Sequence, residues 1–165
     1  MQIFLVGDRE SDYSTELHVL RARLPAAKRA RVTIIPETDQ PYLYYRAGDI
    51  AVCSSRLESY PRVVLEAMAL GLPIIATPVF GIVEQVREDV NASLFSPDDD
   101  EKLAAALDRL VANDQIRQSM GRNSELLFRG LIQYDEMLTS YGDIMREACL
   151  SSPPMPRLME PVCAA

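Results

Sequence analysis

Two glutamates, Glu58 and Glu66, stand on either side of a proline in the stretch ESYPRVVLE and are candidates for binding chemistry. Glu58 lies in a predicted loop, whereas Glu66 lies in the helix that Pro61 is well placed to begin. The N-terminus of a helix has unpaired N–H groups and a partial positive charge, which favour a phosphate group. A carboxylate beside that phosphate can accept hydrogen bonds from ribose hydroxyls. The spacing therefore suggests a nucleoside diphosphate site, with both acids facing one crevice.

The same residues also have ordinary structural explanations, which their spacing leaves open. Glu66 follows Arg62 by four residues, so the two side chains can form a weak ion pair on the helix surface. Glu58 can be a solvated loop acid. Gly81 can be a turn glycine without a ligand, and Glu84 can be a solvated helix residue.

The elements that must position these residues alternate regularly between strands and helices. Several predicted strands are apolar throughout, which is typical of parallel strands covered by helices on both faces. We therefore predict an α/β fold with a Rossmann-like, doubly wound parallel sheet, followed after Asp100 by extra C-terminal helices. The expected strands are residues 1–6, 31–38, 49–55, 72–78 and, closing in a turn, 92–100. The expected helices are residues 11–24, 41–47, 61–71, 101–113, 114–128 and 131–148.

The loops that follow the predicted strands hold the candidate site. In parallel α/β sheets, ligands bind at the carboxyl ends of the strands. Four loops lie there, at residues 6–8, 36–38, 54–58 and 77–81.

The composition excludes several classes of protein. The 165 residues, 48% of them hydrophobic, are enough for one domain with a real core. With 24 acidic against 17 basic side chains, the chain repels the phosphate backbone of nucleic acids. The 3 cysteines are far apart, which indicates a reducing cytoplasm, and His18 as the single histidine cannot supply a multi-histidine metal site. No apolar run reaches the roughly 20 residues that a bilayer span needs.

The stretch of residues 49–86 resembles the donor-binding half of the family-four, group 1 retaining glycosyltransferases of the GT-B fold. The resemblance continues through ASLFSPDDDEKLAAALDRLVAND and covers the chain from Met1 to about Glu147. The features that carry it are the strand DIAVCSS, the Glu58 and Glu66 pair, the helix LEAMALG, the strand PIIAT, Gly81 and Glu84.

The resemblance implies transfer of a sugar from a UDP-, GDP- or ADP-sugar, with retention at the anomeric carbon, and a place in polysaccharide biosynthesis. Glu58 would lie beside the donor sugar and the reaction centre, and Glu66 would hold the ribose hydroxyls. The leaving diphosphate would itself accept the acceptor's proton, so no protein nucleophile, metal or further cofactor is expected. The other residues implied at the donor are Arg62, Val63, Gly81, Ile82 and Val83 through backbone N–H groups at the diphosphate, Ser54 and Ser55 at the rim, and Pro36, Glu37 and Thr38 beside the base.

Two features depart from the pattern of this family. Phe80 stands where family members often have a second glycine, so close approach of the backbone to a ligand is not assured there. Residues 58–61 read ESYP where others have a glycine-rich turn, and Pro61 removes one N–H donor.

The family's C-terminal half normally opens with a further strand and a glycine-rich loop bearing an arginine and a lysine, and an acceptor-binding N-terminal domain precedes it. Neither matches this sequence. We therefore expect residues 1–148 to form a nucleotide-sugar-binding domain without its first strand, inactive alone, and the proline-rich residues 149–165 to be a disordered or draped tail. The expected partners are the nucleoside diphosphate sugar, the missing acceptor domain or subunit, and further copies of the chain through an uncovered sheet edge. We expect the protein in the cytoplasm. If the missing domain binds a lipid-linked acceptor, we expect the protein at the inner face of the membrane.

Two interpretations of other classes account for part of the sequence. A non-catalytic binding or assembly module would keep the fold and lose the reaction. A receiver-type signalling domain shares the alternating pattern and the acidity, but it needs an acidic cluster after the first strand and a lysine after the last one. Here Asp8 stands without such a cluster, and neither lysine is in place.

Overall fold

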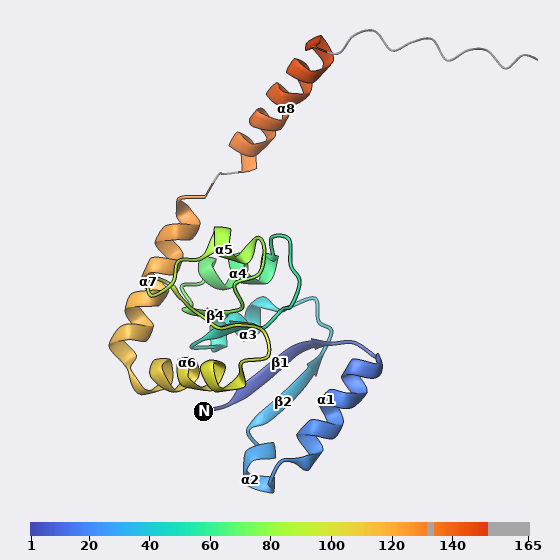
Figure 1. The fold of residues 1–165 in the computed structure, drawn as a ribbon, viewed down its shortest axis with the longest axis vertical. Coiled ribbons are helices and arrows are strands. Elements are labelled where there is room, and N and C mark those ends of the chain that lie inside the picture. The colour runs from blue at the N-terminus through green and yellow to red at the C-terminus, as the bar shows by residue number, and fades with distance from the viewer. Residues whose placement is uncertain (132–133, 152–165) are drawn as a thin grey trace, which may run out of the picture. The chain divides into compact units, whose positions relative to one another are not determined.

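A computed structural model describes residues 1–131 and 134–151 (Figure 1). Its contacts divide the chain into two compact units, residues 1–130 and 131–165, and each is described by itself. Residues 152–165, which make up most of the tail predicted at 149–165, lie outside the described residues. The domain limit predicted at residue 148 stays a prediction.

Strands and helices alternate along the first unit as the sequence predicts (Figure 1). The strands are β1 (Ile3–Asp8), β2 (Val32–Pro36), β3 (Ala51–Cys53), β4 (Ile74–Ala76) and β5 (Ala92–Leu94). The helices are α1 (Asp12–Arg23), α2 (Ala26–Arg29), α3 (Tyr42–Ala47), α4 (Arg62–Ala69), α5 (Ile82–Gln85), α6 (Asp100–Ala112) and α7 (Asp114–Arg129). Each element predicted within this unit is present, and the short helices α2 and α5 are not among the predicted ranges.

All strand pairs are parallel, but the strands form two sheets rather than one. β1 pairs with β2 in the first sheet, and the second sheet has the order β3-β4-β5. In the doubly wound order 3-2-1-4-5-6, the first strand lies between the second and the fourth. If β1 is the family's second strand, as the resemblance implies, the place of the first strand lies between β1 and β3, where the sheet is divided. The predicted parallel α/β fold is confirmed, with its strands divided between two sheets.

The core lies around β4, whose residues are all fully buried. Ile74 and Ala76 pack into one cluster with residues of α4 and α5. Ile75 packs into a second cluster with Leu110 of α6 and Met120 of α7. Because successive side chains of a strand point to opposite faces, helices cover both faces of this sheet, and Figure 1 shows α4 and α6 on opposite sides of β4.

The sheet of β1 and β2 is much less covered. None of the residues in either strand is fully buried, and Phe4 is 52% exposed and Val6 40% exposed. Among the described residues, the buried hydrophobic side chains all lie between Cys53 and Met120. Parallel sheets are normally covered on both faces, so β1 and β2 carry apolar surface that a further element would bury.

Helix α4 begins and ends where the sequence predicts. Pro61 directly precedes its first residue, with a φ of −68° that suits the ring. Gly71, just beyond the C-cap Leu70, has a φ of +70°, which glycine adopts without strain. A Cβ at Gly121 of α7 would lie 2.3 Å from the carbonyl oxygen of Gly71, so this glycine lets α7 pack closely against the end of α4.

The second unit contains α8 (Tyr134–Ser151). Exposed apolar side chains recur along it every three or four residues, which places them on one face of the helix. They include Tyr134, Leu138, Tyr141 and Met145. Within the part of the chain that the structure describes, no helix is both long and apolar enough to cross a membrane. The C-terminal helices predicted after Asp100 are thus present as α6, α7 and α8.

Candidate functional site

Glu58 lies beyond the carboxyl end of β3, in the loop that leads to α4. Its side chain is partly buried, and its Oε1 accepts a hydrogen bond of 3.0 Å from the hydroxyl of Ser55. The carbonyl of Ser55 in turn accepts a hydrogen bond from the hydroxyl of Thr77, a fully buried residue that follows β4. The neighbouring Ser54 is exposed. These bonds hold Glu58 at the edge where β3 and β4 end, the edge at which ligands bind in such sheets.

The loops after β3 and β4 touch at Gly81. A Cβ at this position would lie 1.5 Å from the carbonyl oxygen of Ser59, so any other residue would force the two loops apart. The φ of Gly81 is −65°, which every residue can adopt. The close contact, rather than the conformation of the turn, therefore requires glycine here.

Phe80 stands beside this contact with a φ of 39°, in the left-handed region that favours glycine. This is the position at which family members often have a second glycine. Its side chain is 66% exposed and lines an open pocket of about 430 Å³ together with Leu57, Glu58 and Ser59. The departure from the family pattern therefore places an aromatic ring beside Glu58 and leaves the backbone strained.

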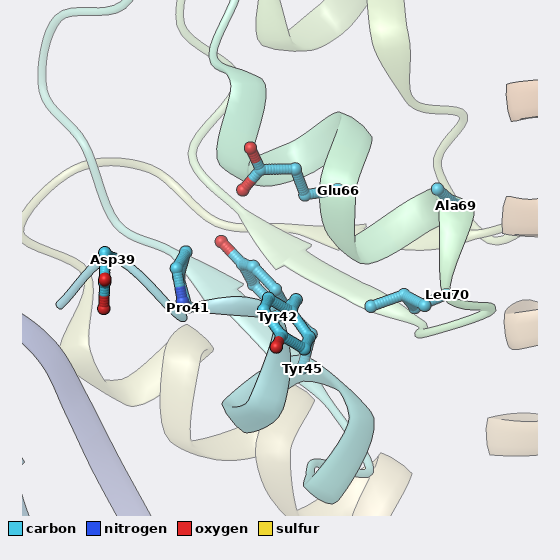
Figure 2. A pocket seen from close by; sticks show the side chains of 7 residues that line it. All are labelled: Asp39, Pro41, Tyr42, Tyr45, Glu66, Ala69 and Leu70. Carbon is cyan, nitrogen blue, oxygen red and sulfur yellow. The ribbon is translucent and has the colours of Figure 1, made fainter.

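Glu66 lies in the middle of α4 and lines a different pocket, of about 360 Å³ (Figure 2). Its Oε1 lies 3.3 Å from Nη2 of Arg62, and the two side chains are 35% and 88% exposed. The surface ion pair weighed from the sequence is thus present, and its exposure keeps it weak. The residues that line the pocket are Asp39, Pro41, Tyr42, Tyr45, Glu66, Ala69 and Leu70.

Helix α3 brings Tyr45 to the same pocket, with its hydroxyl beside the carboxylate of Glu66 (Figure 2). Burial raises the pKa of Tyr45 to about 12, and the negative charge of Glu66 and the hydrogen bond to it act in the same direction. The hydroxyl therefore stays protonated at neutral pH and is a hydrogen-bond donor toward the carboxylate.

The two acids occupy separate pockets. The sequence predicts that Glu58 and Glu66 face one crevice, but no residue lines both pockets. Glu58 approaches from the loop before α4 and Glu66 from the second turn of the helix. The start of α4 lies between them in the chain, as the sequence predicts.

Backbone N–H groups at the start of α4 are available to an anion. Within the described part of the chain, those of Arg62 and Val63 have no hydrogen-bond acceptor, as expected of a first helical turn without a side-chain cap. The N–H group of Gly81 likewise has none there. Those of Ile82 and Val83 donate to carbonyls within their own turn, at 3.1 and 3.3 Å.

The loop after β2 holds the residues predicted beside the base. Glu37 forms an ion pair with Arg9, whose Nε donates to Oε2 at 3.2 Å and whose Nη2 donates to Oε1. This hydrogen-bonded guanidinium holds the pKa of Glu37 below its usual value. Thr38 accepts a hydrogen bond of 3.1 Å from the N–H of Gln40, and Pro36 is the last residue of β2. Arg9 thus already holds the carboxylate of Glu37.

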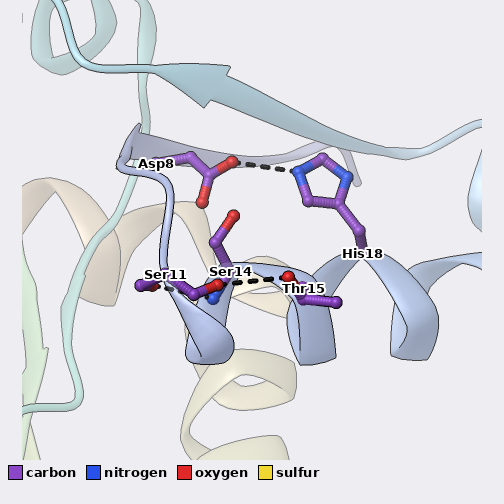
Figure 3. Close-up of polar contacts among 5 residues, drawn as sticks. All are labelled: Asp8, Ser11, Ser14, Thr15 and His18. Atoms are coloured by element: carbon purple, nitrogen blue, oxygen red, sulfur yellow. Dashed lines mark hydrogen bonds and ion pairs between the residues drawn. The ribbon is translucent and has the colours of Figure 1, made fainter.

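The single histidine, His18, lies on α1, and its ring reaches Asp8 at the end of β1 (Figure 3). Nε2 of His18 is 2.9 Å from Oδ2 of Asp8, and hydrogen bonds from His18 and Ser14 hold the pKa of Asp8 below its usual value. Ser11 caps α1 by accepting the N–H of Ser14 at 3.1 Å. Across residues 1–131 and 134–151, no group of three or more His, Cys, Asp or Glu side chains is placed to hold a metal ion. The hydrogen bonds of Asp8 with His18 and of Ser11 with Ser14 fix the turn between β1 and α1.

Sequence reasoning missed two residues that adjoin Glu66 or the start of α4. Thr77 begins a loop that the sequence singles out, because it is the polar residue that ends an apolar strand, but no contact was assigned to it. The two missed residues, Tyr45 and Gln85, carried no signal, because their partners are distant in the sequence. Gln85 is 2% exposed, and its Nε2 donates to the carbonyl of Pro61 at 3.1 Å, which ties α5 to the start of α4.

The chain matches known proteins both in sequence and in fold. The model of the glycosyl transferases group 1 family matches residues 1–126, which include β1 to β5 and both acids. The chain belongs to this family.

Two curated relatives show how much of such a protein the chain represents. The D-inositol 3-phosphate glycosyltransferase of Salinispora arenicola is 32% identical over 143 residues, which cover 79% of this chain and 32% of that protein. An uncharacterized glycosyltransferase of Haemophilus influenzae is 34% identical over 99 residues, covering 58% of this chain and 28% of that protein. The chain thus spans about a third of the length of these relatives.

Solved glycosyltransferase structures share the fold. Sucrose-phosphate synthase from Thermosynechococcus elongatus has a TM-score of 0.77 at 28% identity, over 92% of this chain and 39% of that one. HepE of Anabaena in complex with UDP-glucose has a TM-score of 0.80 at 25% identity, over 88% of this chain and 41% of that one. The predicted family and its GT-B fold are confirmed, and this group 1 chain corresponds to a part of the longer proteins.

The backbone at Phe80 gives a first test. Phe80→Gly and Phe80→Ala both remove the exposed ring, but the left-handed φ costs an L-residue roughly 1–2 kcal/mol that glycine avoids. The entropy that glycine loses on folding offsets about 0.5–1 kcal/mol of this. The glycine variant should therefore have a free energy of unfolding about 0.5–1 kcal/mol above that of the alanine variant, measured by urea denaturation. A more stable alanine variant would contradict the strained φ.

The contact between Tyr45 and Glu66 gives a second test. Glu66→Gln should lower the pKa of Tyr45 from about 12 toward 10.0, because it removes the neighbouring negative charge. Since the folded pKa lies above the unfolded one, wild-type stability should also fall as the pH rises above 10.0. The pKa is measured from the ¹³C signal of the Tyr45 ring, with the exposed acid variant Glu16→Gln as the control. An unchanged titration of Tyr45 in Glu66→Gln would show that the contact is absent.

Proposed function

We propose that this chain is the donor-binding half of a retaining glycosyltransferase and is inactive by itself. The observation that carries the proposal is the placement of Glu58 and Glu66, one before and one within α4, in a chain of the group 1 family. The unoccupied N–H groups of Arg62 and Val63 support binding of a diphosphate at the start of this helix.

The donor is a nucleoside diphosphate sugar, with UDP, GDP or ADP as its nucleotide. The structure of HepE with UDP-glucose supports this class of donor. Glu66 accepts hydrogen bonds from the ribose, and the N–H group of Gly81 joins those of α4 at the diphosphate. The other residues around the donor are Ser54 and Ser55 at the rim, Ile82 and Val83 near the diphosphate, and Pro36, Glu37 and Thr38 beside the base.

Glu58 lies beside the donor sugar at the reaction centre. The bond between the anomeric carbon and the diphosphate oxygen breaks, and the acceptor hydroxyl oxygen bonds to that carbon on the same face. The acceptor's proton passes to the departing diphosphate, so the configuration is retained. The protein contributes positioning and charge stabilisation, with Ser55 orienting the Glu58 carboxylate, and the proposal needs neither a metal nor a covalent nucleophile.

The acceptor binds to a domain that this chain does not contain. The chain spans about a third of the length of its relatives, and GT-B enzymes react in a cleft between two domains. An N-terminal acceptor domain or subunit is therefore the proposed partner, and it would complete the charge compensation at the diphosphate. We propose that the whole protein acts in polysaccharide biosynthesis and lies in the cytoplasm. With a lipid-linked acceptor, it would act at the inner face of the membrane.

Nucleotide titration tests the proposal. UDP, GDP or ADP added to ¹⁵N-labelled protein should shift the amide signals of residues 54–66 and 77–83. Glu66→Ala should weaken binding about tenfold, because the ribose loses hydrogen bonds to a charged acceptor. Glu16→Ala, which removes an exposed acid on α1, is the matched control and should bind like the wild type.

The absence of shifts with all three nucleotides at about 10 mM would overturn donor binding. Binding of a partner chain by a protein that ignores nucleotides would instead favour a non-catalytic assembly module.

Contact between copies through the free sheet edges is a further part of this proposal. Among the described strands, β1 pairs with β2 alone and β3 with β4 alone, so each has an unpaired edge. Sedimentation velocity over a range of concentrations should reveal dimers or larger species. Val52→Lys on β3 should reduce them, because a charge at the edge opposes pairing, whereas Val111→Lys on α6 should not. A wild type that stays monomeric at every concentration would contradict this contact.

A further inference from the structure

Among the side-chain oxygens of the pocket beside Glu66 that the proposed function does not use, the hydroxyl of Tyr45 is the one that faces the carboxylate (Figure 2). Tyr45 lies on α3 and Glu66 on α4, with β3 between them in the chain. Packing of α3 against α4 brings the hydroxyl to face the carboxylate (Figure 2). The ring of Tyr45 also packs against the core cluster that includes Val64 and Met68 of α4. The hydroxyl is therefore held by packing on the same helix that carries Glu66.

The lone pairs of the Glu66 carboxylate can be assigned to partners. An ionised carboxylate offers about four positions for hydrogen-bond donors. Nη2 of Arg62 lies 3.3 Å from Oε1, and the hydroxyl of Tyr45 faces the carboxylate across the same pocket (Figure 2). With one position for each of these two donors, about two positions remain, and a ribose presents two adjacent hydroxyls.

Arg62 and Tyr45 restrain the carboxylate of Glu66 to different degrees. The side chain of Arg62 is 88% exposed, so its ion pair with Glu66 is weak and loses side-chain entropy. The ring of Tyr45 is partly buried, packs against the core cluster and has few torsions, and its hydroxyl is protonated at neutral pH and can donate. Tyr45 is therefore the partner that fixes the orientation of the carboxylate.

We propose that Tyr45 is a positioning residue that holds the Glu66 carboxylate so that it accepts hydrogen bonds from both the 2′ and the 3′ hydroxyls of a nucleotide ribose. The inference rests on the proposed function, because it requires that Glu66 binds the ribose. Without the hydroxyl of Tyr45, the carboxylate turns toward Arg62, and the hydrogen bond to one ribose hydroxyl is lost. The pocket then discriminates less between ribonucleotides and 2′-deoxyribonucleotides.

The test compares affinities for UDP, GDP and ADP with those for their 2′-deoxy counterparts, by NMR titration. The wild type should prefer the ribonucleotide by about tenfold, because a hydrogen bond to a charged group is lost in the deoxy form. In Tyr45→Phe this ratio should fall to about twofold or less. Tyr44→Phe is the matched control, since Tyr44 lies on the same helix and its ring packs against Phe4, and it should keep the wild-type ratio.

Each outcome separates the inference from the proposed function. A preference for ribonucleotides that persists in Tyr45→Phe overturns the inference and leaves the proposed function standing. Nucleotide binding by the wild type without a ribose preference overturns the inference as well. The absence of binding to every nucleotide overturns the proposed function and the inference with it.

A measurement on the wild type covers the case in which Tyr45→Phe does not fold. The ¹³C signal of the Tyr45 ring carbon that bears the hydroxyl should shift more with the ribonucleotide than with the 2′-deoxy form, because the shared carboxylate gains a hydrogen bond. Equal shifts at saturation would overturn the inference.

Discussion

Burial of β4 between two layers of helices is the constraint on which the rest of the structure depends. Its side chains alternate between the cluster formed with α4 and α5 and the cluster formed with α6 and α7. Buried backbone polar groups must be paired, and β4 meets this need by pairing with β3 on one side and β5 on the other. The carboxyl ends of these strands are thereby fixed side by side, at the edge from which the loops of Glu58, Thr77 and Gly81 begin.

The two acids are supported in different ways by this core. Glu66 lies on α4, whose Val64, Ala67 and Met68 are buried, so the position of its carboxylate follows from packing. Glu58 lies in a loop, and its position depends on the hydrogen bond from Ser55. Groups built on helices are placed more precisely than groups on loops. In the proposed reaction, the nucleotide is therefore held by the rigid element, and Glu58 is held by a loop.

The local features of the fold could be predicted from the sequence, whereas the contacts between distant residues could not. Apolar strands alternating with helical patterns indicated the parallel α/β fold, and Pro61 and Gly71 marked the ends of α4 because both act on their own backbone. The division into two sheets depends on strand pairing, which no local pattern encodes. For the same reason the sequence showed neither that each acid lines its own pocket nor that Tyr45 meets Glu66. The turn pattern marks Gly81 as a candidate, but the reason for glycine there is its contact with Ser59, a residue of another loop.

The contact between Gly81 and Ser59 also restricts how this part of the molecule can evolve. A single added methyl group at residue 81 has no room while the carbonyl of Ser59 stays where it is. A change at residue 81 is thus tolerated only after residues 57–60 have been rebuilt, and an insertion in that segment must keep clear of the glycine. Residue 81 and the segment of residues 57–60 must therefore change together. We expect natural variation in the shape of the Glu58 pocket to involve simultaneous substitutions in both loops rather than single substitutions.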